Sequence, residues 1–171
     1  KRISGKCKCD RYIAYFQSYT NTYGDVDALR EKFLAAARRD DVAAVSIASR
    51  PDCFGPEVID MIKDIIAVKP VWIELGLQTA NDRTAQLINR CYDISVYDET
   101  MNRLRELGVH IIVHMIIGLP GETKEDMIDT VRYIVRSGAN GIKLQLLHVL
   151  RGTVLEKMYE QNFITYDQKN D

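Results

Sequence analysis

One stretch of the chain places a histidine inside an otherwise apolar run and ends that run with a glycine–proline turn. The run covers residues 110–117, and His114 is the polar side chain within it. A histidine in such a place is either a core histidine with satisfied hydrogen bonds or a contact to a ligand. The apolar pattern predicts a parallel strand covered on both faces, and the turn at residues 118–121 leads into a helix that Thr123 and Asp126 can cap. Because the carboxyl ends of parallel strands carry the chemistry in α/β folds, this turn marks a candidate site.

Three charged residues could also do chemistry. Glu74 lies inside a predicted strand, where it either points into the fold as a site carboxylate or pairs with Lys143 as a structural ion pair. A lyase or aldolase would use a lysine or a carboxylate as its base, and a buried Lys143 would favour that class. Arg90 follows the predicted strand that holds Glu74, and it either belongs to a site or is a solvated charge that pairs with Asp93.

Alternating strand and helix patterns must position these residues. The strands are predicted at residues 12–17, 43–48, 71–77, 110–117 and 141–148, each followed by a helical pattern. Units spaced roughly thirty residues apart suit right-handed crossovers and give a parallel sheet. A complete eight-stranded barrel typically needs about 250 residues. The 171 residues of this chain therefore predict an α/β partial barrel or an open sheet.

Polar loops follow all five predicted strands. They comprise residues 17–21, 49–52, 78–82 with Arg90, 118–122 and 148–153. Loops at one face of a parallel barrel gather into one site. The periodicity thus predicts a small-molecule enzyme site on a (βα) scaffold without specifying its reaction.

Composition excludes several classes of protein. The net charge of −1 gives no global basic field for nucleic acid, although a local basic face is compatible with it. No apolar run reaches the roughly 18 residues of a membrane span, and no secretory signal is visible, so we expect no membrane partner. The four scattered cysteines predict a reducing, cytoplasmic location. The chain begins at Lys1 rather than Met, so we expect a processed or fragmentary protein.

Several segments together resemble the radical S-adenosylmethionine (SAM) superfamily. They are residues 73–79 (IELGLQT), 88–90 (INR), 114–123 (HMIIGLPGET) and 147–153 (LHVLRGT). The branch that they resemble contains the elongator catalytic subunit and oxygen-independent coproporphyrinogen oxidase. Residues 15–22 and 49–52 resemble an uncharacterised bacterial group within it. The resemblance covers residues 11–155 and implies a TIM-like partial barrel, six-stranded when intact, of which about five strands are present here.

The resemblance also implies roles for individual residues. Gln78 would bond the SAM ribose, His114 would contact the same ribose, and Arg90 would pair with the SAM carboxylate. The loop that holds the amino group of SAM departs from the family pattern, so only backbone contacts are expected there. Those loop positions include Gln17, Ser18 and Thr20. Adenine would lie against the backbone of Gly118, Leu119, Pro120 and Val149.

The cysteine motif of the family is missing. Relatives hold a [4Fe-4S] cluster with three cysteines, usually Cys-x3-Cys-x2-Cys, whereas the close pair here is Cys7 and Cys9. We therefore expect one radical SAM core domain over residues 1–171 that lacks its first βα unit and its cluster ligands. Residues 1–10 would form a loop, 11–155 the βα units, and 156–171 a helix and tail. The edge strand at 12–17 would be covered by residues 1–10 or by a second copy in a homodimer.

Three hypotheses on function follow. The first is the core of a radical SAM enzyme that modifies an unknown substrate, with RNA favoured, and that takes electrons from a reductant such as flavodoxin or ferredoxin. This fragment itself would be inactive. The second is a (βα)-barrel lyase or aldolase, which a buried Lys143 would favour. The third is a SAM- or nucleotide-binding module without catalysis.

Overall fold

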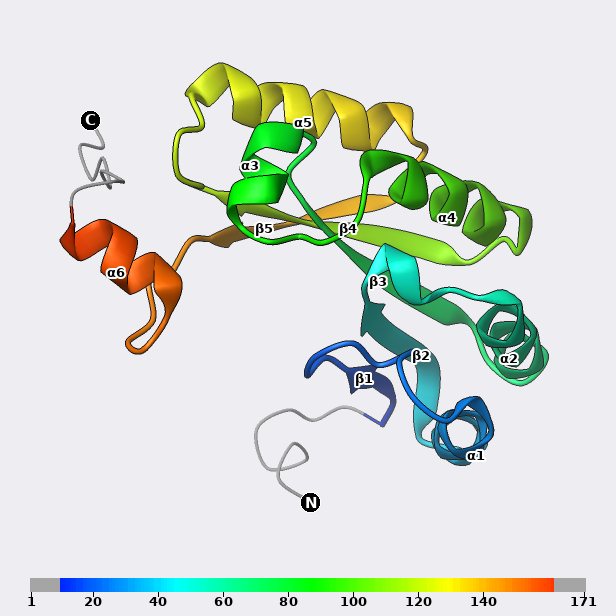
Figure 1. Cartoon of the computed structure of the whole chain (residues 1–171). Coiled ribbons are helices and arrows are strands. Elements are labelled where there is room, and N and C mark those ends of the chain that lie inside the picture. The colour runs from blue at the N-terminus through cyan, green and yellow to red at the C-terminus, as the bar shows by residue number, and fades with distance from the viewer. Residues whose placement is uncertain (1–9, 162–171) are drawn as a thin grey trace.

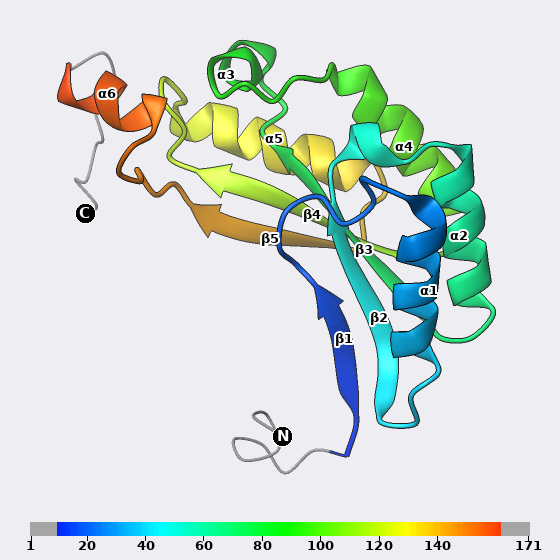
Figure 2. The same ribbon diagram turned by 60° about the horizontal axis from the view of Figure 1, so that its bottom comes forward.

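The computed structural model describes residues 10–161, in which five parallel strands form one sheet (Figure 1). Strands adjacent in the sequence are adjacent in the sheet, in the order β1-β2-β3-β4-β5, and every pair is parallel. The sheet curls around a concave face, so that it forms part of a barrel (Figure 2). The predicted partial α/β barrel with five strands is therefore confirmed. Its strands are β1 Tyr12–Phe16, β2 Val42–Ser49, β3 Val71–Gln78, β4 His110–Ile117 and β5 Gly141–Leu146.

The longer helices cover the convex face of the sheet, and the short ones lie beyond its strands. The former are α1 Val26–Ala37, α2 Pro56–Ile66, α4 Ile94–Glu106 and α5 Lys124–Arg136. The latter are the 3₁₀ turn η1 Pro51–Cys53, α3 Asp82–Leu87 and α6 Val154–Glu160. Within residues 10–161, no helix lies on the concave face (Figure 2). None of these helices is long and apolar enough to cross a membrane.

The core lies between the sheet and its convex-face helices. Alternate residues of β3 and β4 point toward the helices, and Ile73, Leu75, Ile111 and Val113 are fully buried there. Because side chains alternate along a strand, Glu74 and His114 point to the concave face instead. Burial of one apolar face thus fixes which residues face the interior of the half-barrel.

Local signals decide where several elements start. The bounds of β4 match the predicted run, and Thr123 and Asp126 form the predicted capping box at the start of α5. The side chain of Thr153 accepts from the backbone N–H of Glu156 and caps α6. The strand predicted over 141–148 ends earlier, at Leu146.

Among the described residues, β1 forms one edge of the sheet and pairs with β2 alone. The prediction that residues 1–10 cover this edge falls on residues that lie outside the described range, apart from Asp10. The predicted tail after residue 161 lies outside it as well.

Candidate functional site

A pocket of about 350 Å³ opens where β3 and β4 end. Its apolar walls come from α3, from the residues at and after the end of β4, and from the segment that follows β5. They comprise Leu87, Ile88, Ile116, Leu119, Leu147, Val154, Leu155 and Met158. The polar lining is confined to Arg50, Gln78, Asn89, Arg90 and Tyr92. An apolar slot with a few polar groups suits a flat heteroaromatic ring that carries a polar substituent, such as a nucleoside.

Gln78 presents an unused hydrogen-bond acceptor in this pocket. The ladder between β3 and β4 shifts register between Gly76 and Gln78, and Gln78 has a left-handed backbone with φ of 71°. Its side chain folds back across Gly76, where an added Cβ would lie 2.8 Å from Nε2. The Oε1 atom of Gln78 is buried and has no hydrogen-bond partner among residues 10–161. Since a buried unpaired carbonyl costs free energy, this oxygen fits a ligand donor such as a ribose hydroxyl.

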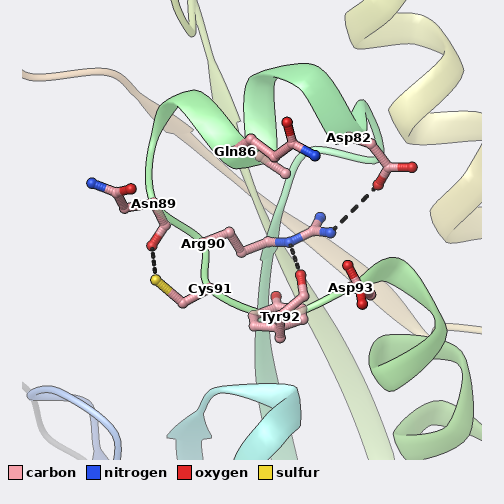
Figure 3. A pocket seen from close by; sticks show the side chains of 8 residues that line it. Asp82, Gln86, Asn89, Arg90, Cys91, Tyr92 and Asp93 are labelled. Carbon is pink, nitrogen blue, oxygen red and sulfur yellow. Dashed lines mark hydrogen bonds and ion pairs between the residues drawn. The ribbon is translucent and has the colours of Figure 1, made fainter.

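The guanidinium of Arg90 anchors the linker that follows α3. Its side chain is only 3% exposed, and it donates to the carbonyls of Thr79 (2.8 Å) and Tyr92 (3.1 Å). Asp82 lies 3.7 Å from Nη2, and the Tyr92 ring lies 4.7 Å below the guanidinium carbon. Figure 3 shows Arg90 pointing from the linker toward Asp82. These contacts use much of the group predicted to pair with the SAM carboxylate, and that role stays a prediction.

A second pocket, of about 420 Å³, is lined by α3 and this linker (Figure 3). Its polar lining includes Asp82, Gln86, Asn89 and Asp93, beside the exposed thiol of Cys91. That thiol donates to the carbonyl of Asn89 at 3.0 Å. The hydrogen bonds and the ion pair of Arg90 and Cys91 in this pocket fix the conformation of the linker after α3.

Of the residues that line the nucleoside-sized pocket, sequence reasoning named only Gln78, Arg90 and Leu119 as site residues, and it missed two, Arg50 and Tyr92, that hold the polar part together. Arg50, directly after β2, pairs with Asp52 through two hydrogen bonds of 2.9 and 2.7 Å and donates to the carbonyl of Arg90 at 3.1 Å. The hydroxyl of Tyr92 donates to the carbonyl of Gly76 at 2.5 Å. The Tyr92 ring thus contacts both arginines, and this packing joins the loops after β2 and α3. Only the position of Arg50 at a strand end was a signal in the sequence.

The loop after β1 does not reach this pocket. Gln17 and Ser18 are exposed, Thr20 is half-buried, and none of the three is among the lining residues. The neighbouring Asn21 fixes the loop, because its Nδ2 donates to the carbonyls of Phe16 (3.1 Å) and Ala48 (2.9 Å). Backbone contacts from this loop to a ligand stay a prediction.

The turn after β4 does reach the pocket. Gly118 has φ of 83°, a left-handed conformation that suits glycine, and it lets the chain reverse so that Leu119 lines the pocket. Leu119 and Pro120 are both buried. Beyond β5, Leu147 and Val154 line the pocket, whereas Val149 is half-buried and does not.

Glu122, the residue that follows the turn after β4, joins this turn to the end of β3. It accepts a hydrogen bond from the hydroxyl of Thr79, the residue after Gln78. Burial raises the pKa of the Glu122 carboxyl, although the hydrogen bonds from Thr79 and Thr84 oppose that shift. This contact fixes the end of β3, where the backbone of Gln78 takes its unusual conformation.

A separate polar cluster lies on the concave face and includes the predicted site residue His114. Its centre is Glu74, which is only 7% exposed. Oε2 of Glu74 lies 2.6 Å from His114 Nε2, 2.7 Å from the Tyr15 hydroxyl and 3.1 Å from Lys143 Nζ. Oε1 accepts from Ser46 at 2.9 Å. We call these five residues the concave-face cluster; each comes from a different strand. His114 does not line the nucleoside-sized pocket, so its ribose contact stays a prediction.

The protonation states of the cluster follow from its contacts. Burial by itself would raise the pKa of Glu74, but its hydrogen bonds outweigh burial and lower that pKa to about 2. Burial lowers the pKa of His114, against the opposing effect of Glu74. Burial would lower the pKa of Lys143, but hydrogen bonds to Tyr15 and Glu74 raise it. At neutral pH the carboxylate is therefore ionised, the imidazole neutral and the lysine cationic.

Glu74 points to the interior and pairs with Lys143, so the predicted ion pair is confirmed, whereas a role as a site carboxylate stays a prediction. The Lys143 side chain is 34% exposed and carries a stabilised charge. A Schiff-base lysine needs a neutral amine, which desolvation normally favours. The feature that would support a lyase or aldolase, a buried Lys143, is therefore not found.

Within residues 10–161, no three Cys, His, Asp or Glu side chains are grouped so that they could hold a metal ion. Cys53 is half-buried and Cys91 exposed, and both are free thiols. Cys7 and Cys9 lie outside the described residues. The described residues therefore fit the adenosine part of SAM, and they offer no set of ligands for an iron–sulfur cluster.

A parallel half-barrel with a nucleoside-sized pocket at its carboxyl edge defines the class of fold. The chain belongs to the radical SAM superfamily, because the model of that family matches residues 6–134. This confirms the family predicted from the sequence. Members of the family use SAM and a [4Fe-4S] cluster, and a related structure, the methyltransferase TsrM from Kitasatospora setae, contains such a cluster.

Relatives include the uncharacterised protein YtqA of Bacillus subtilis, 42% identical over 99% of this chain and 53% of YtqA. The tRNA uridine(34) acetyltransferase of Dehalococcoides mccartyi is 30% identical over 70% of this chain and 26% of that enzyme. The chain thus spans only about half of YtqA.

Solved structures share the fold at low identity. Elp3 of Methanocaldococcus infernus has a TM-score of 0.80 at 17% identity, covering 95% of this chain and 44% of that one. Coproporphyrinogen III oxidase HemN of Escherichia coli has a TM-score of 0.71 at 19% identity, covering 90% and 35%. The branch that the sequence resembles is thus represented by both of these proteins among structures of this fold.

Proposed function

We propose that this chain is the SAM-binding core of a radical SAM enzyme that modifies RNA. The observation that carries the SAM-binding part is the buried Oε1 of Gln78, which no described residue pairs with, at a pocket of about 350 Å³ with apolar walls. An adenine ring fills such a slot, and a ribose hydroxyl donates to that oxygen.

Different residues of the pocket would contact different parts of SAM. Leu119 and Ile116 pack against adenine, and the backbone of the turn at Gly118 lies at its edge. Gln78 accepts from the ribose. Arg50 and Arg90 place positive charge at the polar end of the pocket, where the methionyl carboxylate would lie. Bound SAM and a reduced [4Fe-4S] cluster would supply radical chemistry here, a 5′-deoxyadenosyl radical for abstracting hydrogen from the substrate.

The proposal extends to the cluster ligands and to a separate protein that supplies electrons. We propose that cysteines outside this chain hold the cluster, that a flavodoxin or ferredoxin supplies electrons, and that the enzyme works in the cytoplasm. The chain alone would then be inactive. A SAM-binding module without catalysis is the alternative, and a cysteine triad elsewhere in the natural protein would argue against it.

Two relatives with tRNA-modifying names support RNA as the substrate class. They are the tRNA uridine(34) acetyltransferase and a tRNA-2-methylthio-N(6)-dimethylallyladenosine synthase of Leifsonia xyli, 30% identical over 68% of this chain and 22% of that enzyme. A gel-shift titration of bulk tRNA with this chain tests whether the chain binds RNA. We expect binding that weakens steeply with added salt, as phosphate contacts require. Binding that is absent at low salt, or insensitive to salt, would contradict the RNA assignment.

Calorimetric titration with S-adenosylhomocysteine tests the pocket. We expect binding weaker than about 1 µM, since no cluster chelates the methionyl end, and a further loss of about ten-fold in Gln78→Ala. Gln145→Ala, on a strand that supplies no lining residue, is the control. No detectable binding, or equal affinity in Gln78→Ala, would show that the pocket does not take adenosine. Dithionite with SAM should yield no 5′-deoxyadenosine from this chain.

A further inference from the structure

The imidazole of His114 keeps one nitrogen available on the concave face. Nε2 lies 2.6 Å from the Glu74 carboxylate, which can only accept, so the neutral ring carries its proton on Nε2. The lone pair is then on Nδ1, for which no partner is found among the described residues. Within residues 10–161, the hydrogen bonds of His114 thus leave a basic atom unused.

A histidine held by a carboxylate in this way is the arrangement that serves general-base catalysis. The carboxylate fixes the tautomer and stabilises the imidazolium that forms when the other nitrogen takes a proton. Here Glu74 is itself fixed by donors from three further strands: Tyr15, Ser46 and Lys143. Such restraint holds the ring in one orientation.

The cluster lies on the same face as the nucleoside-sized pocket. Glu74 and His114 each precede, by two positions, a residue that lines that pocket, namely Gly76 and Ile116. Residues two apart on a strand point to the same side of a sheet. No helix of residues 10–161 covers this face (Figure 2). The side chain of His114 keeps only 11% of its surface exposed, so a substrate on the concave face would reach it through that part while a nucleoside fills the pocket.

We propose that the concave-face cluster is a proton-transfer site, in which His114 Nδ1 accepts a proton from a hydroxyl or N–H group of the substrate. The bond between that proton and the substrate oxygen or nitrogen breaks, its electron pair stays on the substrate, and an N–H bond forms at Nδ1. The reverse step returns the proton. Glu74, Lys143 and Tyr15 are positioning residues, since they act on His114 rather than on the substrate.

The alternative is that the cluster only ties five strands together. That role needs the same hydrogen bonds, but it needs neither a free nor a reachable Nδ1. The reactivity of His114 separates the two cases, and it does so independently of SAM binding, so either proposal can fail alone.

p-Nitrophenyl acetate is a suitable probe for this chain. Nδ1 attacks the acetyl carbon, p-nitrophenolate leaves, and water then hydrolyses the acetylimidazole. The chain has three histidines, so His110→Gln and His148→Gln are matched controls for His114→Gln. We expect His114→Gln to lower the release of p-nitrophenolate at least five-fold, and each control to change it less than two-fold. Equal effects of the three substitutions would overturn the proposal.

The pH profile supplies a readout that a structural role would not move. Glu74, Lys143 and Tyr15 are the titratable groups at hand, with Glu74 favouring the imidazolium and Lys143 opposing it. In a plot of the rate of p-nitrophenolate release against pH, Lys143→Met should therefore move the inflection to higher pH. Glu74→Gln should move it to lower pH. If Glu74→Gln does not fold, ¹⁵N spectra of the unsubstituted chain decide, because a proton on Nδ1 instead of Nε2 would refute the assignment.

Discussion

Nε2 of His114 lies 2.6 Å from Oε2 of Glu74, so that a contact between positions 40 apart in the chain joins β4 to β3. Ser46, Tyr15 and Lys143 extend the contact to the remaining strands. The Glu74 carboxylate therefore accepts from four donors. If it were removed, each of these donors would lose a hydrogen bond in a setting that is at least partly shielded from water.

Replacement of Glu74 by Gln should lower the free energy of unfolding by about 2 kcal/mol. The four donors share two acceptor oxygens of the carboxylate, whereas the amide of Gln offers them only one. Urea denaturation measures the change. Glu31→Gln, at an exposed position of α1, is the matched control and should alter stability by less than about 0.5 kcal/mol. A Glu74→Gln chain as stable as the control would mean that the cluster contributes little.

Stability should fall in acid in two stages. The folded-state pKa of His114 is lowered, so its contribution is present above the unfolded pKa near 6.5 and is lost as pH falls below that value. The folded-state pKa of Glu74 is lowered from 4.5 to about 2, so its contribution is lost as pH falls between those values.

Urea midpoints measured across this pH range check both stages. His114→Gln should remove the first decline and Glu74→Gln the second. A first decline, below pH 6.5, that persists in His114→Gln would belong to another group.

Gly76→Ala should weaken the binding of S-adenosylhomocysteine about ten-fold. An added Cβ would lie 2.8 Å from Nε2 of Gln78, so the amide must leave its position in the pocket. Gly55→Ala is the control, because a methyl group added there would meet nothing within 4 Å and the φ of Gly55 is −66°. If the two variants bind equally in calorimetry, the position of the Gln78 amide does not matter for the ligand.

Thr123→Ala should lower the free energy of unfolding by about 1 kcal/mol, the usual cost of losing a helix cap. Thr123 caps α5 directly after the turn that lines the pocket, and its side chain accepts from the N–H of Asp126. Thr123→Ser keeps the hydroxyl and should retain most of the stability in urea denaturation. Equal losses in both variants would point to the methyl group rather than to the cap.

The sequence by itself determined the elements and their order. The apolar run of β4 and the capping box of Thr123 are local signals, and five βα repeats in this length leave only a partial barrel. The resemblance of Gln78 and Gly118 to a family pattern was visible for the same reason, since each stands at a fixed offset from a strand end.

Only the tertiary structure decided how the polar residues meet. The left-handed backbone of Gln78, the packing of Tyr92 between Arg50 and Arg90, and the pairing of His114 with Glu74 depend on contacts between distant segments. Such contacts depend on strand register, which is set when the helices bury one face of the sheet. A side-chain period of two then leaves the opposite side chains of all five strands on one concave face.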